Sequence, residues 1–423
     1  MLLKILHINT FDQGGAANSC IRLHLCLIDL RINSKLLIKE KKVYVSNSYE
    51  FFSLSWKNRF IEFLKKIGFR LGISNYPLLG YREKERKKIY KEYFPFFEFF
   101  STPYSDFDLT ETKLFKEADI IHLHWVAGFL DYPSFFSKCY KPVVWTLHDM
   151  APFTGGYHYL GNDLSSEESR KEVPHFFEKQ SQLLNEFLTI KKSALSKFDR
   201  LSIVAPSQWL LKLSSKSELF SRFSHFHIPY GLPKQIFRYQ DTLEAKEKLN
   251  LPMDKFILLF VSDSIINPRK GMKILLEALK QLDMDAIQLY CVGKVVDSSE
   301  LEEIKFLGKI QDPSQLAIIY SAADLFIIPS IEDNLPNTVL EALMCGAPVL
   351  GFPIGGIPEM VISGQNGFLA NEISVQGLSK ALQFSIQNLN QLDRKQISNN
   401  AKNKYSSEIQ AKKYLELYQS LLN

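Results

Sequence analysis

The sequence predicts an α/β protein with two doubly wound, Rossmann-like domains. Short apolar runs typical of buried strands alternate with helical stretches, and after Lys255 the alternation starts a second time. Such alternation is typical of parallel sheets covered by helices on both faces. The length of 423 residues also exceeds that of one ordinary domain. We expect an N-terminal domain over 1–235, a second domain over 236–400, and a C-terminal helix over 401–423 that packs back on the N-terminal domain.

In the N-terminal half, the first strand, KILHINT, leads through Gly14 and Gly15 into a helix. A strand, a Gly-rich loop and a helix are how parallel α/β sheets present backbone amides to phosphate groups. This pair is not the full GxGxxG fingerprint, and a tight turn is the commoner reason for two adjacent glycines. Irregular insertions are expected at about 41–112 and 160–195. Four further strands are expected at ADIIHLHWV, KPVVWTLHD, RLSIVAPS and FHIPYGL.

In the second half, the stretch IEDNLPNTVLEALMCGAP predicts a helix over about 336–344. Pro suits a first helical turn, Gly346 stands where helices end, and Asp333 or Asn334 is expected to cap the helix. Five strands are expected at FILLFVSD, IQLYCVG, IKFLGKI, LFIIPS and PVLGFP.

The same helix places Asp333 just before its first turn and Glu341 inside it. The amides of Asn337 and Thr338 are expected to point outward from its N-terminus without intrahelical partners. This end of the helix is therefore predicted to bind an anion such as a phosphate.

A second anion site is predicted where NPRKG follows the strand FILLFVSD and opens a helix. Lys270 can neutralise a phosphate as a point charge, and Gly271 lets the backbone come close. A solvated charge pair, Arg269 and Lys270, is the alternative. Cations are disfavoured at a helix N-terminus, so their presence there favours a bound anion.

Histidines mark the ends of two predicted strands of the first domain. His122 and His124 share one face of a strand, and His148 ends the next strand with Asp149 beside it. These residues can bind a metal, or they can line a cleft at the carboxyl edge of the sheet. No HExxH or Glu-rich companion accompanies them, which favours the cleft. Two DxD triplets are expected to be solvated turns, at 106–108 and 283–285.

The net charge of +5 is concentrated in one window. Between Lys57 and Lys91, eleven Lys or Arg stand against three Glu, a local charge of +8. Apolar residues at helical spacing make this a basic amphipathic segment that can lie on an anionic membrane surface. An ordinary surface helix is the slightly favoured alternative, and no motif supports nucleic-acid binding. The apolar residues are Phe60, Phe63, Leu64, Ile67 and Leu71.

The cysteines and the N-terminus are consistent with a cytoplasmic protein. Five cysteines show no metal-binding spacing and stand in apolar surroundings, which predicts buried thiols in a reducing compartment. No apolar stretch reaches the roughly 20 residues that span a bilayer. The start, MLLKILHINTF, is expected to be a buried strand and not a signal peptide, because Lys4 interrupts a short apolar run.

Five motifs resemble the retaining glycosyltransferases of family 4, which have the GT-B fold. They are PRKG, EDNLPNTVLEALMCGAPVLGFPIGGIPEMV, SGQNGFL, IHLHW and TLHDMAPFTGGYHY. The last two resemble a subgroup that builds bacterial surface polysaccharides. The resemblance implies two Rossmann-like domains facing a cleft, a nucleotide-sugar donor, a glycan or lipid-linked acceptor, and no metal cofactor.

The resemblance also implies roles for the matching positions of the second domain. Asp333 would hydrogen-bond the hydroxyls of the donor sugar, Glu341 would hold the ribose, and Lys270 would be the cation of the diphosphate. Asn337 and Thr338 would donate amides to that diphosphate.

In the first domain, Gly14 and Gly15 would bring backbone to the diphosphate, and His148 would contact the donor sugar near the reacting carbon. The chain departs from the family pattern in three ways. Asp333 is one methylene shorter than the usual Glu, Pro336 removes an amide donor, and Ser264 stands where the family has Arg. Arg269 is the candidate replacement for that Arg.

Together these features predict a retaining glycosyltransferase of the hexosyltransferase type, acting in cell-surface polysaccharide or lipid-linked glycan synthesis. It would be cytoplasmic, or peripheral on the inner face of the plasma membrane. Fixed dipoles and cations would stabilise the leaving diphosphate without a metal. The first alternative is an epimerase or hydrolase of the same fold, which would use His148 and Asp149. The second is a non-catalytic nucleotide-sugar-binding protein, which Ser264 and Asp333 favour.

Overall fold

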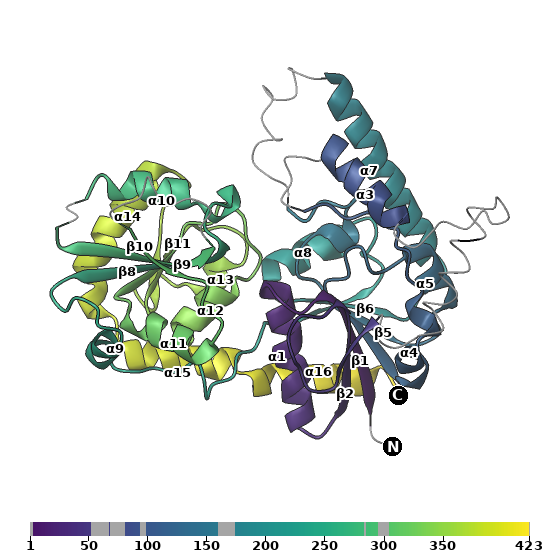
Figure 1. Ribbon diagram of the computed structural model, residues 1–423, viewed down its shortest axis with the longest axis horizontal. Helices are drawn as coiled ribbons and strands as arrows, with labels where there is room; N and C mark the ends of the chain where they lie inside the picture. The colour runs from purple at the N-terminus through teal and green to yellow at the C-terminus, as the bar shows by residue number, and fades with distance from the viewer. Residues whose placement is uncertain are drawn as a thin grey trace. The chain divides into compact units, whose positions relative to one another are not determined.

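The chain forms two compact units. A computed structural model describes residues 3–51, 67, 81–93, 99–159, 174–282, 285–294 and 304–422 (Figure 1). The main boundaries between the units fall between Ile228 and Pro229 and between Lys413 and Tyr414. The sequence analysis placed the domain ends at 235 and 400. Unit 1 comprises Met1–Pro206, Leu210–Ile228 and Tyr414–Asn423, and unit 2 comprises Ser207–Trp209 and Pro229–Lys413.

Unit 1 is built on a parallel sheet with the strand order β3-β2-β1-β4-β5-β6-β7. The order reverses between β1 and β4, and ligands of doubly wound sheets bind at the carboxyl edge near such a reversal. Strands β4, β5 and β6 are buried at every residue, as expected of a sheet covered on both faces. The strands are β1 Lys4–Phe11, β2 Asn33–Glu40, β3 Ser48–Glu50, β4 Ile120–Leu123, β5 Val143–Thr146, β6 Leu201–Ala205 and β7 Ser224–His227.

Helices connect these strands, and several begin at side-chain caps that the sequence supplies. Asp131 accepts from the Ser134 amide at the start of α5, and Thr112 accepts from the Phe115 amide at the start of α4. The helices and helical turns are α1 Gly15–Asp29, α3 Tyr81–Tyr93, η2 Leu109–Glu111, α4 Lys113–Glu117, α5 Tyr132–Lys138, η3 Ala151–Phe153, α7 Pro174–Leu195 and α8 Gln208–Lys216.

Unit 2 has its own parallel sheet, with the strand order β10-β9-β8-β11-β12-β13. Successive residues of β8 and β11 alternate between two apolar cores: Leu259 packs with Ile328 on one face, and Leu258 packs with Ile327 on the other. The order reverses between β8 and β11. The strands are β8 Phe256–Ser264, β9 Ile287–Lys294, β10 Ile304–Gly308, β11 Leu325–Ile328, β12 Val349–Gly351 and β13 Gly367–Leu369.

Both faces of the second sheet carry helices. Leu275 of α10 and Leu378 of α14 belong to one core, and Tyr320 of α11, Val339 of α12 and Ile397 of α15 belong to the other. The helices and helical turns are α9 Thr242–Lys248, η5 Pro268–Lys270, α10 Met272–Leu279, α11 Pro313–Ala322, α12 Asn337–Met344, α13 Ile357–Met360, α14 Val375–Asn388, η6 Leu389–Gln391, α15 Arg394–Tyr405 and α16 Ser407–Ser420.

These two units confirm the predicted fold class, two doubly wound α/β domains followed by a helical tail. The end of α16 belongs to unit 1, where Tyr418 OH bonds His122 Nδ1 at 2.6 Å and Tyr414 OH bonds Thr146 Oγ1 at 2.6 Å. All five cysteines are buried free thiols, as predicted. No helix in the described part of the chain is long and apolar enough to cross a membrane.

Some expectations were wrong or concern residues outside the described ones. The stretch at about 160–195 was expected to be irregular, but Pro174–Leu195 form helix α7. The helix predicted at 336–344 is α12, but its N-cap is Pro336 and no side chain caps it, so the predicted cap by Asp333 or Asn334 is wrong. The reason is that Asp333 pairs with cations. Most of the basic window from Lys57 onward, including its apolar stripe except Ile67, lies outside the described residues. The second DxD triplet is also only partly described, whereas Asp108 of the first is the N-cap of η2 and pairs with Lys138.

Candidate functional site

The candidate site of unit 2 lies at the reversal of its sheet. Lys270 follows β8 and Asp333 follows β11, the two strands that flank the reversal point. Lys270 Nζ donates to Asp333 Oδ2 at 2.6 Å, and Arg269 Nη1 lies 3.7 Å from the same oxygen. Three of the residues predicted from sequence are therefore brought together by the fold.

The carboxylate of Asp333 is buried and ionised. Burial raises the pKa of this group, but the charges of Lys270 and Arg269 and the hydrogen bonds from Lys270 and the Asn334 amide outweigh burial, so the net pKa is below its ordinary value. Arg269 Nη1 also donates to Glu332 O at 2.8 Å. The cluster thus places two cations beside the carboxylate of Asp333.

Glycines bring the backbone segments of this cluster close together. Gly271 has φ +74°, and a Cβ there would lie 1.8 Å from Pro329 O. Gly355 has φ +53°, and a Cβ there would lie 1.7 Å from Asp333 O. The Gly-Gly of the GGIPE motif therefore packs directly under the loop that carries Asp333, and no larger residue fits at either position.

Helix α12 begins four residues after Asp333 and carries Asn337, Thr338 and Glu341, the other residues of this unit that were predicted to bind the nucleotide sugar. Asn337 and Thr338 form its first turn and are half-buried. The first intrahelical bond that the backbone makes there runs from Val339 N–H to Pro336 O at 3.1 Å. One turn further, Glu341 is buried and its Oε2 accepts from Tyr320 OH at 3.1 Å.

In unit 1, the predicted glycine pair starts helix α1. Gly14 is its N-cap with φ +98°, and no atom lies within 4 Å of a Cβ placed there. The positive φ angle, and not a close neighbouring atom, is therefore the reason for a glycine at position 14. Gly15 is the first residue of α1 and its carbonyl accepts from Ser19 Oγ.

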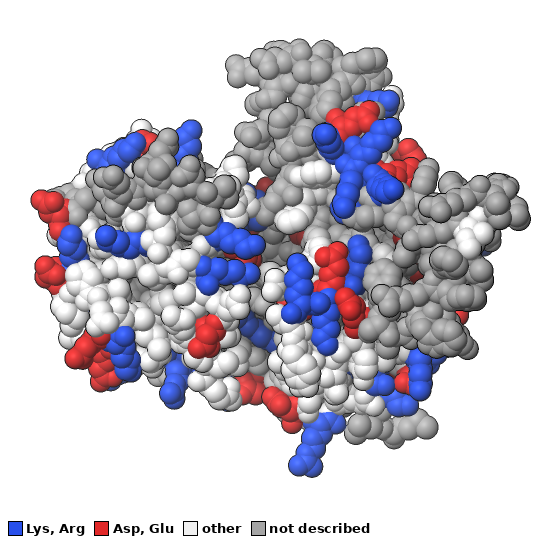
Figure 2. Space-filling model, viewed as in Figure 1, with Lys and Arg blue, Asp and Glu red and all other residues white. Residues whose placement is uncertain are grey.

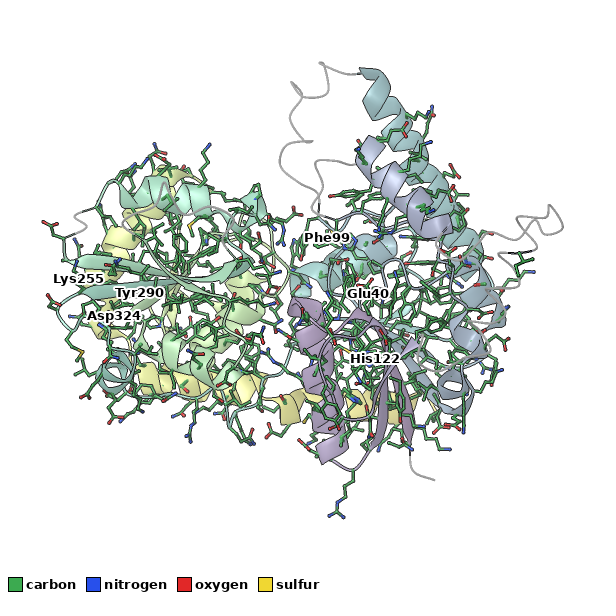
Figure 3. All side chains as sticks on the ribbon, viewed as in Figure 1. Glu40, Phe99, His122, Lys255, Tyr290 and Asp324 are labelled. Carbon is green, nitrogen blue, oxygen red and sulfur yellow. The ribbon has the colours of Figure 1, made fainter. Side chains whose placement is uncertain are left out.

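Buried histidines gather in unit 1 at the centre of its sheet (Figure 3, label His122). His7 Nδ1 lies 3.0 Å from His124 Nε2, and His124 Nδ1 lies 3.3 Å from His148 Nε2. Burial, aided by neighbouring histidines, lowers the pKa of His7 and His124 well below the ordinary value. Burial lowers the pKa of His148 to about 4, against the effect of Asp149. The lowered pKa values favour neutral imidazoles at pH 7, which exchange hydrogen bonds and are also the form that binds metals.

The metal-binding alternative involves a different set from the one that the sequence suggested. Ligand atoms of His7, His122 and His124 lie within 4.8 Å of one another, whereas Asp149 is bound elsewhere. Both ring nitrogens of His122 already bond hydroxyls, Tyr418 OH at 2.6 Å and Thr146 Oγ1 at 2.7 Å. A metal held by all three histidines would have to break one of these bonds.

A small pocket opens in unit 1 beside these histidines. His148 and His124 line it, together with His158, Ser101 and Lys191, which sequence reasoning missed. The contact among these residues joins segments far apart in the chain. The GGYHY stretch was quoted for its resemblance only, and no spacing rule connects it to Ser101. Apolar and aromatic lining comes from Trp125, Val126, Leu130, Tyr132 and Trp145.

With this geometry in place, comparisons with known proteins bear on the second unit most directly. Residues 241–404 match the family described as glycosyl transferases group 1. A lipopolysaccharide 1,2-N-acetylglucosaminetransferase of Salmonella typhimurium is 26% identical over 66% of this chain and 81% of its own length. A putative teichuronic acid biosynthesis glycosyltransferase, TuaC of Bacillus subtilis, is 30% identical over 40% of this chain and 44% of its own length. The second alignment thus spans less than half of that relative.

Solved structures share the whole fold. Sucrose-phosphate synthase from Thermosynechococcus elongatus superposes with a TM-score of 0.68 at 17% identity, covering 99% of both chains. HepE of Anabaena in complex with UDP-glucose gives a TM-score of 0.61 at 17% identity, covering 99% of this chain and 100% of that one. WaaG, a glycosyltransferase involved in lipopolysaccharide biosynthesis, gives 0.60 at 14% identity over 98% and 99%. At these identities the likeness establishes the GT-B fold alone.

Proposed function

We propose that this chain is a retaining glycosyltransferase that moves a sugar from a nucleotide-sugar donor to an acceptor in cell-surface polysaccharide or lipid-linked glycan synthesis. The segment that matches the glycosyl transferases group 1 family supports the transferase class. The names of the Salmonella and Bacillus relatives support a saccharide acceptor of the cell envelope. The complex of HepE with UDP-glucose supports a nucleotide-sugar donor.

One observation carries the proposal: two cations, Arg269 and Lys270, lie against Asp333 at the sheet reversal, inside the segment that matches the family. Cleavage of a sugar–phosphate bond leaves negative charge on a diphosphate, and fixed cations and dipoles stabilise such charge. The donor's diphosphate would take over Lys270 from Asp333. That carboxylate would then be free to accept hydrogen bonds from the donor sugar.

In this proposal the other residues bind and orient the donor. The amides of Asn337 and Thr338 contact the diphosphate, Glu341 accepts from the ribose hydroxyls, and Gly15 offers first-unit backbone. His148 contacts the donor sugar as a neutral imidazole, in keeping with the burial that lowers its pKa to about 4. Both Gly14 and Gly15 shape the turn that begins α1.

The transfer itself needs no enzyme base. The bond between the anomeric carbon and the phosphate oxygen breaks, and the acceptor oxygen bonds to the same face of that carbon. The proton of the acceptor hydroxyl passes to the departing phosphate oxygen. This sequence retains the anomeric configuration, and it gives a hexosyltransferase if the donor is a hexose.

Nucleotide release tests the proposal against its rivals. Nucleotide sugars are first screened by thermal shift, and the one that stabilises the protein most is then incubated with and without acceptor glycans. Release that depends on acceptor supports the transferase. Release without acceptor indicates a hydrolase, and binding without release indicates a nucleotide-sugar-binding protein. NMR of the anomeric proton of the product decides between retention and inversion.

A further inference from the structure

Ser101, His158 and Asp149 form a continuous hydrogen-bonded chain along the pocket of unit 1. His158 Nε2 lies 2.6 Å from Ser101 Oγ, and His158 Nδ1 lies 2.6 Å from Asp149 Oδ2. All three side chains are buried, and all three line the pocket. None of them has a role in the sugar transfer proposed above.

Asp149 orients the imidazole ring of His158. The pKa of Asp149 is lowered because the charge and hydrogen bond of His158 and the donors Ala151 N and Trp125 Nε1 outweigh burial, which raises it. An ionised carboxylate only accepts, so His158 Nδ1 carries the proton that Asp149 receives. In the form of His158 that carries its only proton on Nδ1, Nε2 accepts from the hydroxyl of Ser101, and the proposal below requires this form. The lone pairs of Ser101 Oγ remain for a ligand in the pocket.

Other contacts hold the chain in place. Trp125 Nε1 donates to Asp149 Oδ2 at 2.8 Å, and the Ala151 amide donates to Oδ1 at 2.9 Å. The Ser101 amide donates to Gly156 O at 2.8 Å, and a Cβ on Gly156 would lie 2.2 Å from Ser101 O. The backbone around His158 is therefore built to approach Ser101 closely. Such support by fixed neighbours is typical of a site that must keep its geometry.

The pocket also has a cation and an apolar wall. Lys191 Nζ donates to Ala151 O at 2.6 Å and to Thr154 O at 2.9 Å, which leaves one of its three N–H groups unassigned among the described carbonyls. Burial lowers the pKa of Lys191 to about 7, against the effect of Asp149. Trp125 and Leu130 give the pocket an apolar wall that an apolar part of a ligand would contact.

We propose that Ser101, His158 and Asp149 are a second catalytic site, which hydrolyses short acyl esters. A hydroxyl whose proton is held by a carboxylate-oriented imidazole is an activated nucleophile. The apolar wall would receive the acyl chain, and the charge of Lys191 would stabilise the oxyanion. The three residues differ from those assigned to the sugar transfer, although His148, which is assigned to the donor sugar, lines the same pocket.

The reaction balances with water as the only co-reactant. Ser101 Oγ bonds to the ester carbonyl carbon as its proton moves to His158 Nε2. The ester C–O bond then breaks, and the alcohol leaves with that proton. Water gives a proton to His158 and its oxygen attacks the acyl-serine, so the carboxylic acid departs and Ser101 regains its hydrogen.

The chain offers a matched control in Ser34. Its Oγ lies 2.7 Å from His24 Nδ1 and both residues are buried, but the other nitrogen of His24 bonds Ser46 O at 2.8 Å and no carboxylate orients the ring. Ser34 is not among the residues that line the pocket. Ser34 and His24 are therefore a buried Ser–His pair of the same unit in which a carbonyl takes the place of the carboxylate.

The test combines covalent labelling with ester hydrolysis on the full chain. A fluorophosphonate probe should label the protein, mass spectrometry of the peptides should place the label on Ser101, and p-nitrophenyl acetate should be hydrolysed. Ser101→Ala should lose the label and at least 100-fold of the hydrolysis rate, and Asp149→Asn should lose both in part. Ser34→Ala should keep both.

The peptide that carries the label in the unmutated protein decides the question even where Ser101→Ala fails to fold. No label on Ser101, or hydrolysis that survives Ser101→Ala in a protein with an unchanged circular dichroism spectrum, would overturn the second site. Acceptor-dependent nucleotide release, measured on the same samples, reports on the sugar transfer alone.

Discussion

Lys270 and Asp333, 63 residues apart in the chain, form a close ion pair with Nζ 2.6 Å from Oδ2. The pair puts the expected cation of the diphosphate and the expected partner of the donor sugar in contact before any donor arrives. Arg269, at 3.7 Å, is the second cation of the same carboxylate. The different distances of the two cations lead to the first prediction.

Lys270→Ala should lower the turnover of sugar transfer by more than Arg269→Ala does. Removal of one preorganised donor to a developing anion costs about 100-fold or more in turnover, and Lys270 is the cation that the donor would recruit. Turnover is measured as acceptor-dependent nucleotide release. Lys280→Ala, which removes an exposed lysine of the same unit, should leave turnover unchanged. Equal losses, or a larger loss with Arg269→Ala, would mean that Arg269 has the role of the Arg missing at Ser264.

The same pair predicts a stability effect that separates pairing from catalysis. Lys270→Ala leaves a buried carboxylate with only the more distant Arg269, so the free energy of unfolding should fall by about 1–3 kcal/mol. The double variant Lys270→Ala, Asp333→Ala should regain part of this loss, because no buried charge remains without a close partner. Activity should stay low in the double variant. Urea unfolding measures the free energy, and a double variant no more stable than the single one contradicts the pairing argument.

Glu341→Ala should mainly weaken nucleotide binding. A ribose contact is made in the ground state and the transition state alike, so its loss affects affinity more than turnover. A hydrogen bond to a charged group contributes about 1.5–3 kcal/mol, which corresponds to a roughly tenfold or larger loss of affinity. Calorimetric titration with the free nucleotide gives the affinity. Tyr320→Phe, which removes the hydroxyl that bonds Glu341, is the control for orientation, and unchanged affinity in Glu341→Ala would exclude the ribose role.

The sequence predicted the fold because its signals are local. Strands such as FILLFVSD and LFIIPS are continuous apolar runs, and they form β8 and β11 of the second sheet. Strands β2, β3 and β13 were not predicted. Ser48–Glu50 and Gly367–Leu369 are too short to show a pattern, whereas β2 was missed despite its eight residues. They are strands because their neighbours in the sheet supply the hydrogen bonds.

The site was predictable only where a motif existed. Local spacing pointed to Lys270 and Asp333 separately, but their ion pair depends on how two strands are ordered in the sheet, which the sequence does not display. The same holds for Ser101 and His158, which stand 57 residues apart in the sequence. An isolated β-bridge between Phe100 and Tyr157 brings their segments together, and no local pattern predicts it. Contacts between segments that are distant in the sequence depend on how the whole chain packs, and the local secondary-structure propensity of each segment does not predict them.

Chelation should leave sugar transfer nearly intact. The proposed cations and the N-terminus of α12 replace a metal, and binding at His7, His122 and His124 would require His122 to lose a hydrogen bond. Activity is compared with and without EDTA, and metal content is measured by mass spectrometry of the purified protein. Loss of activity that manganese or magnesium restores would contradict the metal-free mechanism. Zinc that copurifies and disappears in His7→Gln would instead support the histidine site.

Stability should fall as the pH drops below about 6.5. Burial lowers the pKa of His7, His122, His124 and His148 in the folded chain, to about 4 for His148, whereas the unfolded value is 6.5. Below pH 6.5 the unfolded chain takes up protons that the folded chain does not, so the stability present above this pH is lost progressively toward pH 4. Each histidine adds a slope of up to about 1.4 kcal/mol per pH unit.

Urea unfolding at pH 7.5, 6.0 and 5.0 tests this slope above the range where carboxylates titrate. His148→Gln should reduce the slope by the share of one histidine, while substitution of the half-exposed His227 should change it less. A free energy of unfolding that stays constant from pH 7.5 to 5.0 would show that the buried histidines are not neutral in the folded protein.

The basic window should bind anionic vesicles through charge, and helix α3 is its described part. Lys84, Lys88 and Lys91 are exposed and stand three and four residues apart, on one face of α3, while Ile89 and Tyr90 pack against the core of unit 1 that includes Phe100 (Figure 2 shows the charged side chains over α3 and α7). Because Ile89 and Tyr90 face inward, the attraction of Lys84, Lys88 and Lys91 to a membrane would be electrostatic. Each basic residue near an anionic surface contributes about 1 kcal/mol, and salt weakens it.

Charge reversal on this face tests attachment with a control of equal charge. Lys84, Lys88 and Lys91→Glu should reduce co-sedimentation with phosphatidylserine vesicles at low salt and leave nucleotide-sugar binding unchanged, because none of the three lies in unit 2. The matched variant reverses three exposed lysines of unit 2, at Lys248, Lys305 and Lys309, and should keep sedimenting. An acceptor held in a membrane makes such attachment useful, since a weak surface affinity raises the local concentration of the enzyme. Equal loss in both variants would mean that net charge alone causes the binding, and no sedimentation of the unmutated protein would leave α3 as an ordinary solvated helix.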